Sequence, residues 1–596
     1  MCGIAGIVDF DETPSQEAVK AMCRAIRHRG PDDEGIQADP AACLGHVRLS
    51  IIDLSPAGHQ PMTNENSDLW ITFNGEIYNY REIKQTLCRN HTFVSRCDTE
   101  VLVHLWEERN VKAFPDLNGI FAFGIWDSKL RQLTLARDHC GVKPVYYWQR
   151  GNRLVFGSEI KAILAAGIPR MLNYAAVAEH FTFQNIFDDK TFFTDVHLLP
   201  AGCYLQFDSR GCRVARYHEI VFPEPVVEAA PEAVRGRLLS SFSAAVTRQL
   251  VSDVPVGSYL SGGMDTGSIA AIAARTIPQM HTFSCGFDIA EEDKRYHVFD
   301  ESGEAEFLSK RLNTIHHAIS LGHEEFERSV VQTVWHLDEP RMGVSYQNYR
   351  IAETVGRHVK VVLSGVGGDE LFAGYPWRYR WCTENASDRS AYESTVRFFN
   401  DTQIAALFTP ETNKSLSGYS SWEEFRKLMA ACTATDPFNR ALFIDLKTFL
   451  NGILVVDDKL NMAFSVESRV PILDLELVSL AQTIPPGMKL SADTGKVVLR
   501  EAMTALLPER FTMARKQGFT PPDRVWLQKY TMPYVESIIF SSEARARGIF
   551  DEQTIRAMIR EHLAGIKDHR FFLWSLVCFE HMMRLFFDRC TQEKPA

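Results

Sequence analysis

Residues 254–267 read Val-Pro-Val-Gly-Ser-Tyr-Leu-Ser-Gly-Gly-Met-Asp-Thr-Gly, an apolar run that ends in a Ser-Gly-Gly turn. The run Val254–Leu260 predicts a buried strand, and Ser268–Ala274 predicts a helix. Glycines let a backbone approach phosphates closely, and the N-terminus of the next helix supplies N–H groups and a positive dipole end. The spacing differs from the Walker sequence GxxxxGKS/T, so it indicates another kind of phosphate-binding loop.

The side chains of this turn suit a nucleotide that is bound together with a metal ion. Ser261 and Thr266 carry hydroxyls that can donate to phosphate oxygens, and Gly262 and Gly263 leave room for them. Asp265 repels a bare phosphate, so it indicates either a bound Mg²⁺ or an orienting role in the loop. A single Ser-Gly-Gly turn more often binds nothing, so a second signal is needed.

A second glycine-rich loop supplies that signal. Val359–Leu363 predicts another buried strand, which leads into Ser-Gly-Val-Gly-Gly-Asp-Glu at residues 364–370. The carboxyl ends of parallel strands meet at one edge of an open α/β sheet, where ligands bind. We therefore expect both loops to form one crevice for a triphosphate, with Ser364 and Gly365 lining it. Asp265 and Asp369 are the predicted ligands of its Mg²⁺.

Cys2 is a candidate nucleophile far from these loops in the sequence. If the initiator Met is removed, the thiol shares its residue with a free α-amine, whose pKa is about 7.7–8.0. The amine can then accept the thiol proton near neutral pH, directly or through one water. A second-position Cys alone is more often unremarkable, so this interpretation depends on the motifs that follow.

Composition excludes several classes of protein. The length of 596 residues predicts two or more domains. The formal net charge of −11 argues against broad nucleic-acid binding. Its 13 cysteines form no CxxC pair, so we expect neither a zinc site nor a disulfide framework. We see no secretory signal and no apolar run of about 18 residues, and we expect a soluble, cytoplasmic protein without a membrane partner.

The chain divides into two regions with different patterns of apolar residues. Residues 1–210 alternate short β-like runs and a few helix-like stretches, which predicts an α+β domain. The β-like runs are Gly3–Phe10, Leu69–Phe73, Gly119–Trp126, Gln132–Arg137 and Arg153–Gly157, the turn signals are Asn74-Gly75 and Asp127-Ser128, and the helix-like stretches are Ser15–Ile26 and Thr99–Arg109.

A linker is predicted over residues 211–232, because the stretch from Val221 is rich in Pro and Glu. Residues 233–596 then read as an α/β domain with helical additions, in which His281–Phe287 is a further parallel strand. Near the C-terminus one helix face is apolar, and it fits either the core, which we prefer, or the surface of a homodimer. Its residues are Phe571, Phe572, Trp574, Leu576 and Phe579.

In combination these motifs resemble the glutamine-dependent asparagine synthetase family from Cys2 to about Trp526. The resemblance implies an N-terminal-nucleophile sandwich that acts as a class II glutaminase, followed by an ATP-pyrophosphatase domain with a parallel sheet. The matching motifs are CGIAG at 2–6, RHRGPD at 27–32, RLSIID at 48–53, GHQP at 58–61, NGEIYN at 74–79, DTE at 98–100, SGGMDT at 261–266, SGVGGDELFAGY at 364–375, SVESRVP at 465–471, KVVLR at 496–500 and RKQGF at 515–519.

The glutaminase residues have a physical rationale beside the resemblance. Attack of the Cys2 thiol on the glutamine amide creates an oxyanion, for which the Asn74 side chain and the Gly75 backbone N–H are suitable donors. Arg48 offers a bidentate fork for the α-carboxylate of glutamine. Asp98 and acceptors in an expected loop around Glu76 suit the α-ammonium.

In the second domain the resemblance places Tyr259, Leu260 and Cys285 around adenine and Lys516 on the pyrophosphate side. Lys496 is a weaker candidate that pairs with nearby acids, and Glu467 is expected to be structural, holding Arg469 or backbone. These assignments imply that ATP activates a carboxylate by adenylation.

Two positions depart from the pattern of the family. Thr266 replaces the usual Ser but keeps the hydroxyl, whereas Val366 replaces an acid that would act on the incoming amine. Asp338 and Glu339 are our candidates for a substitute acid in the acceptor pocket. Residues 341–350 and 375–380 bring aromatic and Arg side chains that either bind an anionic acceptor or only pack.

The leading hypothesis is an ATP-dependent, glutamine-hydrolysing amidotransferase that forms AMP and pyrophosphate. Ammonia from glutamine would pass internally to an acyl-adenylate, most simply that of aspartate, which would become asparagine. A carboxylate in a specialised metabolite or glycan precursor is the alternative acceptor. A β-lactam-synthetase-like ligase and a non-catalytic binding protein are alternatives of other classes, the second supported only by Val366.

Overall fold

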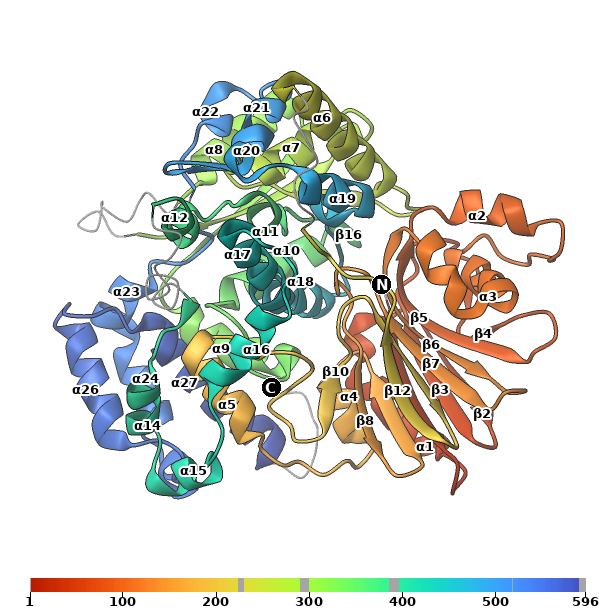
Figure 1. Ribbon diagram of the computed structural model, residues 1–596, viewed down its shortest axis with the longest axis horizontal. Helices are drawn as coiled ribbons and strands as arrows, with labels where there is room; N and C mark the ends of the chain where they lie inside the picture. Colours follow the sequence, from red (N-terminus) through yellow and green to blue (C-terminus); the bar gives the residue numbers. More distant parts are fainter. Residues whose placement is uncertain (1, 223–229, 290–299, 385–395, 517, 589–596) are drawn as a thin grey trace.

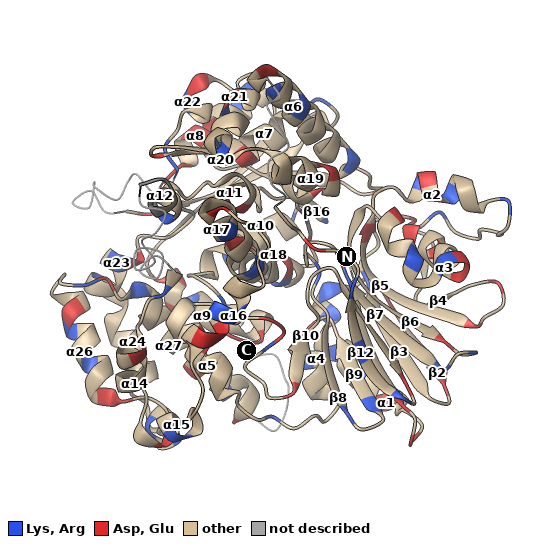
Figure 2. Cartoon of the chain, viewed as in Figure 1, with Lys and Arg blue, Asp and Glu red and all other residues tan. Residues whose placement is uncertain are grey.

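The computed structural model describes residues 2–222, 230–289, 300–384, 396–516 and 518–588. A β-sandwich forms the N-terminal half, and a parallel sheet with many helices forms the C-terminal half (Figure 1). This is the α+β sandwich followed by an α/β domain that the sequence predicts. Acidic and basic residues are interspersed along both halves (Figure 2).

The sandwich consists of two antiparallel six-stranded sheets. Its core lies between them, where Ile4 and Phe156 of one sheet pack with Ala122 and Leu135 of the other. In spatial order the first sheet is β10 (Val196–Leu198), β8 (Tyr146–Arg150), β9 (Arg153–Gly157), β1 (Gly3–Asp9), β3 (Ala42–Arg48) and β2 (Asp33–Asp39). The second is β12 (Gly211–Arg216), β11 (Cys203–Asp208), β7 (Gln132–Arg137), β6 (Gly119–Asp127), β5 (Leu69–Ile77) and β4 (Met62–Thr63).

Helices cover the outer faces of the sandwich. On one face α1 packs on β3, and it begins where the Ser15 side chain accepts a hydrogen bond from the N–H of Ala18 at 3.2 Å. On the other face α3 packs on β5. The N-terminal helices are α1 (Gln16–Ala25), α2 (Tyr80–Leu87), α3 (Asp98–Arg109), α4 (Ile160–Ala165) and α5 (Tyr174–Phe183).

Asn74-Gly75, predicted as a turn, instead lies inside β5. An Asn-Gly pair usually signals a hairpin turn, but here the glycine serves close strand packing. A Cβ on Gly75 would collide with the carbonyl oxygen of Ile120 and the Cα of Phe121 on the neighbouring strand β6. The prediction therefore mistook a steric requirement for a conformational one.

The sandwich extends beyond residue 210, which was its predicted end. Strand β12 pairs with β11 over its whole length, so the second sheet extends to Arg216, inside the range predicted as linker. Residues 223–229 of that range lie outside the described residues, and α6 (Pro231–Arg248) follows.

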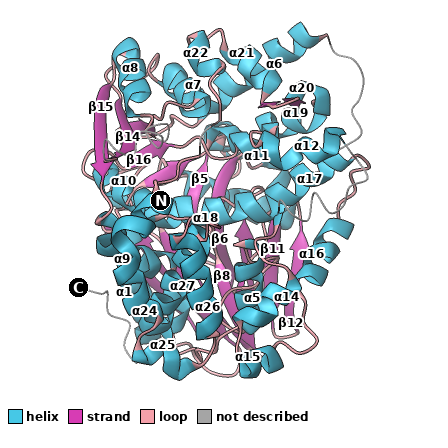
Figure 3. Cartoon of the chain, turned by 90° about the vertical axis from the view of Figure 1, so that its left-hand side faces the viewer, coloured by secondary structure: helices cyan, strands magenta, loops and turns pink. Residues whose placement is uncertain are grey.

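The C-terminal half is built on a parallel sheet in the order β15 (Ile315–Leu321), β14 (His281–Phe287), β13 (Val256–Tyr259), β16 (Val361–Leu363) and β17 (Glu467–Arg469). The three strands predicted from the sequence are β13, β14 and β16. In Figure 3 the sheet lies between α7 (Met264–Ala273) and α8 (Ser302–Leu312) on one side and α10 (Tyr346–Gly356) on the other. Both faces are thus covered, which explains the continuous apolar runs.

Additional helices surround this core, and α18 (Asn451–Met462) lies between it and the sandwich (Figure 1). The other helices of the C-terminal half are α9 (Glu325–Leu337), α11 (Gly368–Phe372), α12 (Pro376–Glu384), α14 (Asp401–Leu407), α15 (Pro410–Ser415), α16 (Ser421–Ala430), α17 (Pro437–Asp445), α19 (Leu475–Thr483), α20 (Pro486–Lys489), α21 (Val497–Met503), α22 (Glu509–Thr512), α23 (Asp523–Trp526), α24 (Met532–Ile539), α25 (Ser542–Arg547), α26 (Glu552–Leu563) and α27 (Arg570–Met582).

The apolar face near the C-terminus belongs to α27 and is part of the core. Phe572, Trp574, Leu576 and Phe579 are all buried there. Within the described ranges, none of the helices combines the length and the apolar character needed to cross a bilayer.

Candidate active sites

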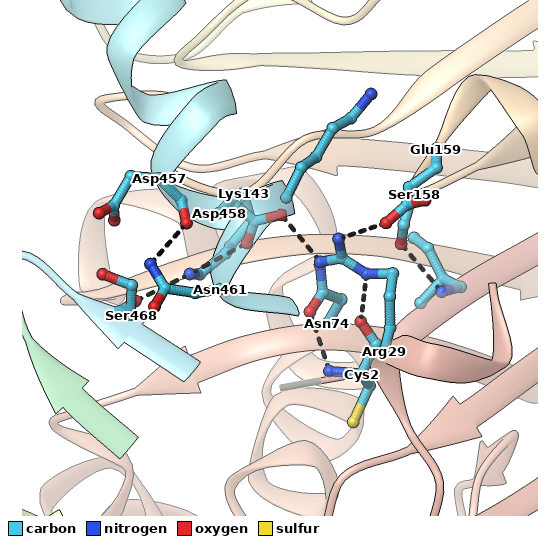
Figure 4. Close-up of polar contacts among 12 residues, drawn as sticks. Cys2, Arg29, Asn74, Lys143, Ser158, Glu159, Asp457, Asp458, Asn461 and Ser468 are labelled. Carbon is cyan, nitrogen blue, oxygen red and sulfur yellow. Dashed lines mark hydrogen bonds and ion pairs between the residues drawn. The ribbon is translucent and has the colours of Figure 1, made fainter. Parts of the chain in front are cut away.

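The predicted glutaminase residues come together at one end of the sandwich. Cys2, Arg48, Gly75, Glu76 and Asp98 line a single pocket, although they come from β1, β3, β5 and α3 and the segments beside them. Asn74 adjoins the pocket through Cys2 (Figure 4). Leu49, Gln60 and Glu467 also line it and were not assigned to it from the sequence.

The Cys2–Asn74 contact fixes the orientation of the Asn74 amide. The Cys2 backbone N–H donates to Asn74 Oδ1 at 3.0 Å, so the amide nitrogen points the other way. Asn74 Nδ2 is buried and has no hydrogen-bond partner in the described residues. Burying a donor without a partner costs free energy, and a donor in this state can hydrogen-bond an incoming anion without first breaking another bond. Burial raises the pKa of the Cys2 thiol, which makes a nearby base necessary for reaction.

Arg48 is held from behind by a loop. Its guanidinium donates to the carbonyl oxygens of Ser55 at 3.0 Å and Asp53 at 2.5 Å. A Cβ on Gly58 would collide with the same guanidinium, so the glycine of the GHQP motif leaves space for Arg48. These contacts fix the planar group at the pocket, where it can receive a carboxylate.

Two acids, Asp98 and Glu76, also line this pocket. Asp98 begins α3 and accepts a hydrogen bond from the N–H of Ile77 at 2.9 Å, and burial raises its pKa to about 6. Glu76 lies inside strand β5, not in the loop that we expected, and Arg469 of β17 donates to it at 3.0 Å. Burial, followed by the Asp98 charge, raises the pKa of Glu76. A cationic ligand between these acids would favour their ionised forms.

All residues predicted to contact ATP line one cleft at the carboxyl ends of β13, β14 and β16. They are Tyr259, Leu260, Ser261, Gly262, Gly263, Asp265, Thr266, Cys285, Ser364, Gly365 and Lys516, and Asp369 joins them. The crevice expected from the two glycine-rich loops is therefore present.

Hydroxyls shape the first loop from within. Ser261 Oγ accepts from the N–H of Gly263 at 3.0 Å, and Thr266 Oγ1 accepts from the N–H of Ser261 at 3.0 Å. Thr266 thus does what a Ser would do at this position. The two hydroxyls also share a hydrogen bond of 3.0 Å, and Thr266 Oγ1 donates to the Gly263 carbonyl oxygen at 3.4 Å. A hydroxyl can rotate, so a ligand oxygen would have to replace one of these internal acceptors.

Two lysines bridge the acids of the cleft. Lys496 Nζ lies 2.5 Å from Asp265 Oδ2 and 2.5 Å from Asp369 Oδ1, and Lys516 Nζ lies 2.7 Å from Asp369 Oδ2. These cations hold the pKa of the Asp369 carboxyl well below its usual range although burial opposes them. Asp265 Oδ1 is buried without a hydrogen-bond partner among the described residues. Two carboxylates that already converge on a cation, with one oxygen to spare, fit a divalent ion such as Mg²⁺.

The acids that we proposed as substitutes for the one missing at Val366 are not in this cleft, and that hypothesis is wrong. Asp338 is fully buried and pairs with Lys459 at 2.6 Å, and Glu339 is fully buried and pairs with Arg341. The acids that do share the cleft with Val366 include Glu370 and Asp457. Burial raises the pKa of Asp457 to about 6.

Two arginines of the segments 341–350 and 375–380 form ion pairs with acids outside the cleft. Arg350 pairs with Glu325 at 3.0 Å, and Arg378 pairs with Asp445 at 2.5 Å. From these two segments the cleft is lined by Asn348 and Tyr375. The tyrosine donates to Glu370 at 2.7 Å, so its ring is fixed at the cleft wall.

Buried charges connect the two sites across the junction between the halves (Figure 4). Arg29 donates to the Cys2 carbonyl oxygen at 3.1 Å and to Asp458 of α18 at 2.9 Å. Lys143 also pairs with Asp458, at 3.3 Å, and donates to the carbonyl oxygen of Ser468 at 3.0 Å. Asp457, the residue before Asp458, lines the nucleotide cleft.

Strand β17 forms a second connection. Glu467 lines the Cys2 pocket and pairs with Arg469 at 2.5 Å, as the structural role predicted for it requires. The Arg469 carbonyl oxygen accepts from the N–H of Ser364 at 2.8 Å, and Ser364 belongs to the nucleotide cleft. One short strand therefore contacts both sites.

The family comparisons match both halves of the chain. The model of a glutamine amidotransferase domain matches residues 1–218, and the model of asparagine synthase matches residues 237–585. Asparagine synthetase 1 (glutamine-hydrolyzing) of Bacillus subtilis is 30% identical, over 97% of this chain and 96% of the relative. A putative asparagine synthetase of Methanocaldococcus jannaschii is 35% identical over 63% of this chain and 76% of the relative.

One relative carries a different name. It is the amidase chry2 of Gibberella zeae, which is 27% identical over 88% of this chain and 90% of the relative. Because the asparagine synthase model matches more than half of the sequence and lies on the half that holds the nucleotide cleft, the chain belongs to the asparagine synthase family.

Proposed function

We propose that this protein is a glutamine-hydrolysing, ATP-dependent ligase that converts a carboxylate into an amide, most simply aspartate into asparagine. Glutamine would be hydrolysed at Cys2, and ATP would adenylate the acceptor in the cleft of Ser261 and Asp369. The observation that carries the proposal is the direct connection between the two pockets through α18 and β17. The intact glutaminase pocket argues against a ligase that needs no ammonia.

In the glutaminase pocket each charge of glutamine has a counterpart. Arg48 would bind the α-carboxylate, and Asp98 and Glu76 would accept from the α-ammonium. After removal of Met1, the α-amine of Cys2 would take the thiol proton. Asn74 Nδ2 would stabilise the oxyanion, because this donor is buried and otherwise without a partner in the described residues.

In the cleft, Asp265 and Asp369 would hold Mg²⁺, and Lys516 and Lys496 would face the pyrophosphate that leaves. The metal would neutralise charge on the phosphate oxygens. Tyr259, Leu260 and Cys285 would contact the adenine. Ammonia would cross the junction internally, because in water near neutral pH it is mostly protonated and inert as a nucleophile.

The free thiol of Cys2 supports the reducing cytoplasm as the place of action.

A second acceptor is favoured by Val366. This apolar side chain lines the cleft where an acid would otherwise act on the amine, so the acceptor side is less negative than the family pattern implies. A carboxylate other than aspartate, in a specialised metabolite or glycan precursor, would suit such a wall. The relative named as an amidase is compatible with variation in the reaction partner.

The test is a product assay with purified protein, Mg-ATP, aspartate and glutamine labelled with ¹⁵N in its amide. Mass spectrometry should detect labelled asparagine together with AMP and pyrophosphate in equal amounts. Glutamate release without labelled asparagine would overturn aspartate as the acceptor and direct the search to other carboxylates. Absence of both glutamate and AMP with every carboxylate tried would overturn the proposed function itself.

A further inference from the structure

A group of four metal-ligand side chains lies on the outer face of the sandwich, away from both pockets. Glu65 comes from the turn between β4 and β5, His91 follows α2, and His104 and Glu107 lie on α3. One ligand atom of each lies within 4.8 Å of the others. None of the four lines the Cys2 pocket or the nucleotide cleft.

The distances within this Glu65 cluster have the scale of a metal coordination shell. His91 Nδ1 lies 3.3 Å from Glu65 Oε1, and His104 Nδ1 lies 3.2 Å from Glu65 Oε2. Glu107 Oε2 lies 3.9 Å from His91 Nδ1 and 4.0 Å from His104 Nδ1. Ligands bound at 2.0–2.2 Å to a tetrahedral Zn²⁺ lie about 3.3–3.6 Å from one another. A small closure of Glu107 would complete this geometry.

His104 has no other use for its ring nitrogens in the described structure. The side chain is 1% exposed, and neither Nδ1 nor Nε2 has a hydrogen-bond partner among the described residues. Buried ring nitrogens that make no hydrogen bond and lie beside carboxylate oxygens are costly to keep, and a cation between these groups would satisfy them.

The second ring nitrogen, Nε2, of each histidine faces a further carboxylate. His91 Nε2 lies 3.4 Å from Glu108, which Asn90 holds at 2.8 Å, and His104 Nε2 lies 3.9 Å from Glu100. In metal sites a ligating histidine commonly donates its second N–H to a carboxylate, which fixes the ring and its tautomer. Nδ1 of each ring would therefore face the metal, and Nε2 would face the outer acid.

Three other histidines lie close together at the opposite half and make a useful contrast. His281, His317 and His358 also have ring nitrogens within 4.8 Å. There, however, His281 Nδ1 and His317 Nε2 share a hydrogen bond of 2.9 Å, so these nitrogens already have partners. No carboxylate belongs to that group, which makes it the weaker ligand set.

We propose that Glu65, His91, His104 and Glu107 bind one divalent first-row transition-metal ion, with Zn²⁺ as the best match. Two imidazoles with two carboxylates suit this class of ion, whereas Mg²⁺ and Ca²⁺ prefer oxygen ligands alone. Four protein ligands leave no open position, so the ion is structural rather than catalytic. It ties the β4–β5 turn and the segment after α2 to α3, whose first residue is Asp98.

The experiment uses the full-length protein after removal of metal with a chelator. Zn²⁺ is titrated in competition with a chromophoric chelator, and Co²⁺ is added separately to record its visible absorption. We expect one tight equivalent of Zn²⁺, an intense tetrahedral Co²⁺ spectrum, and a Tm that rises with Zn²⁺ but not with Mg²⁺. Affinity for Zn²⁺ weaker than about 10 μM would overturn the proposal, since it would give little stabilisation at realistic concentrations.

Variants test whether the tightly bound Zn²⁺ ion lies in the Glu65 cluster. Glu107→Gln changes a partly exposed side chain, and His91→Gln keeps a polar group at a position that is largely buried. Each should weaken Zn²⁺ binding by at least about 10-fold. Glu82→Gln on α2 and His358→Ala serve as matched controls and should bind like the parent. Retention of the tight equivalent in Glu107→Gln and His91→Gln, or its loss in His358→Ala, would overturn the assignment. The Tm of each metal-free variant reports whether it is folded.

Discussion

At the residue scale the most informative side chain is Asn74. Its Oδ1 accepts from the Cys2 backbone N–H, and its Nδ2 has no hydrogen-bond partner in the part of the chain that the structure describes. The change Asn74→Asp keeps the acceptor but replaces the donor by a negative charge. We expect the kcat of glutamine hydrolysis to fall about 10²–10³-fold, which is the usual effect of removing one oxyanion donor. Synthesis with added ammonia should be unchanged.

The matched control is Asn152→Asp on the surface of the sandwich, where the side-chain amide donates to Asp11 at 2.9 Å. It should leave both reactions at the parental rate. An Asn74→Asp enzyme that hydrolyses glutamine at a tenth of the parental rate or faster would show that Asn74 does not stabilise the oxyanion.

Asp98 gives glutamine binding a pH dependence. Burial raises its pKa to about 6, so the folded protein binds this proton more tightly than the unfolded chain does. Ionisation above pH 6 therefore costs folded stability but creates the partner of the glutamine ammonium. In a Cys2→Ala variant, which cannot react, the Kd of glutamine should rise as the pH falls below about 6, approaching tenfold per pH unit.

Isothermal titration between pH 5 and 7.5 measures this Kd directly. The double variant Cys2→Ala/Asp98→Asn should bind weakly at every pH, without the rise below pH 6. A constant Kd for Cys2→Ala from pH 7 to pH 5 would rule out Asp98 as the group that binds the ammonium.

For single residues, a motif can indicate the pocket in which a side chain lies, whereas the chemical role of that side chain stays a prediction. Cys2, Arg48 and Asp265 lie where their motifs suggest. Asp338 and Glu339 were misplaced, because proximity in the sequence to the Asp369 loop says nothing about the lysine and arginine that bury them. The Glu65 cluster carried no sequence signal, since its ligands come from three separate segments.

At the scale of elements the nucleotide cleft depends on close approach between α11 and the loop that follows it. A Cβ on Gly374 would collide with Asp369 Oδ1 and with the Cε of Lys496. The change Gly374→Ala should therefore displace the carboxylate and lower kcat/KM for ATP about 10²-fold, as misplacement of a catalytic group by about 1 Å does. Glutamine hydrolysis without ATP should persist.

Gly487→Ala is the control for this substitution, because no atom lies within 4 Å of a Cβ built there. Its ATP kinetics should equal those of the parent. Parental kcat/KM for ATP in Gly374→Ala would mean that the Asp369–Lys496 geometry is not needed for the reaction.

Strands and helices were easiest to predict where burial is uniform. His281–Phe287 is covered on both faces, so its apolar run had the limits of β14. Asn74-Gly75 was wrong because a turn-forming pair also suits a strand that a neighbour approaches closely. The extent of β12 was missed because its side chains are mostly exposed and carry no alternating pattern.

At the scale of the whole molecule the two halves share buried charges and should unfold together. Asp458 is 1% exposed and pairs with Arg29 and Lys143 of the other half. In rising urea, glutamine hydrolysis and ammonia-dependent synthesis should be lost at the same concentration. Asp458→Ala should lower both midpoints, because breaking a buried ion pair costs about 3–5 kcal/mol.

Glu17→Gln removes an exposed pair with Lys20 and should shift neither midpoint measurably, since solvent screens such surface pairs. Glutaminase activity that survives well beyond the loss of synthesis would show that the sandwich is stable alone. The arrangement of the halves was beyond the sequence, because pairs such as Arg29–Asp458 join residues more than four hundred positions apart.

The neighbouring carboxylates of α18 make chain length, rather than composition, the sensitive property of this helix. Asp457 faces the nucleotide cleft and Asp458 faces Arg29, so each register position of α18 has its own assignment. A single inserted or deleted residue rotates everything beyond it by about 100°. Such a change would withdraw both acids from their partners at once, so homologues should vary in α18 by substitution and almost never by insertion or deletion.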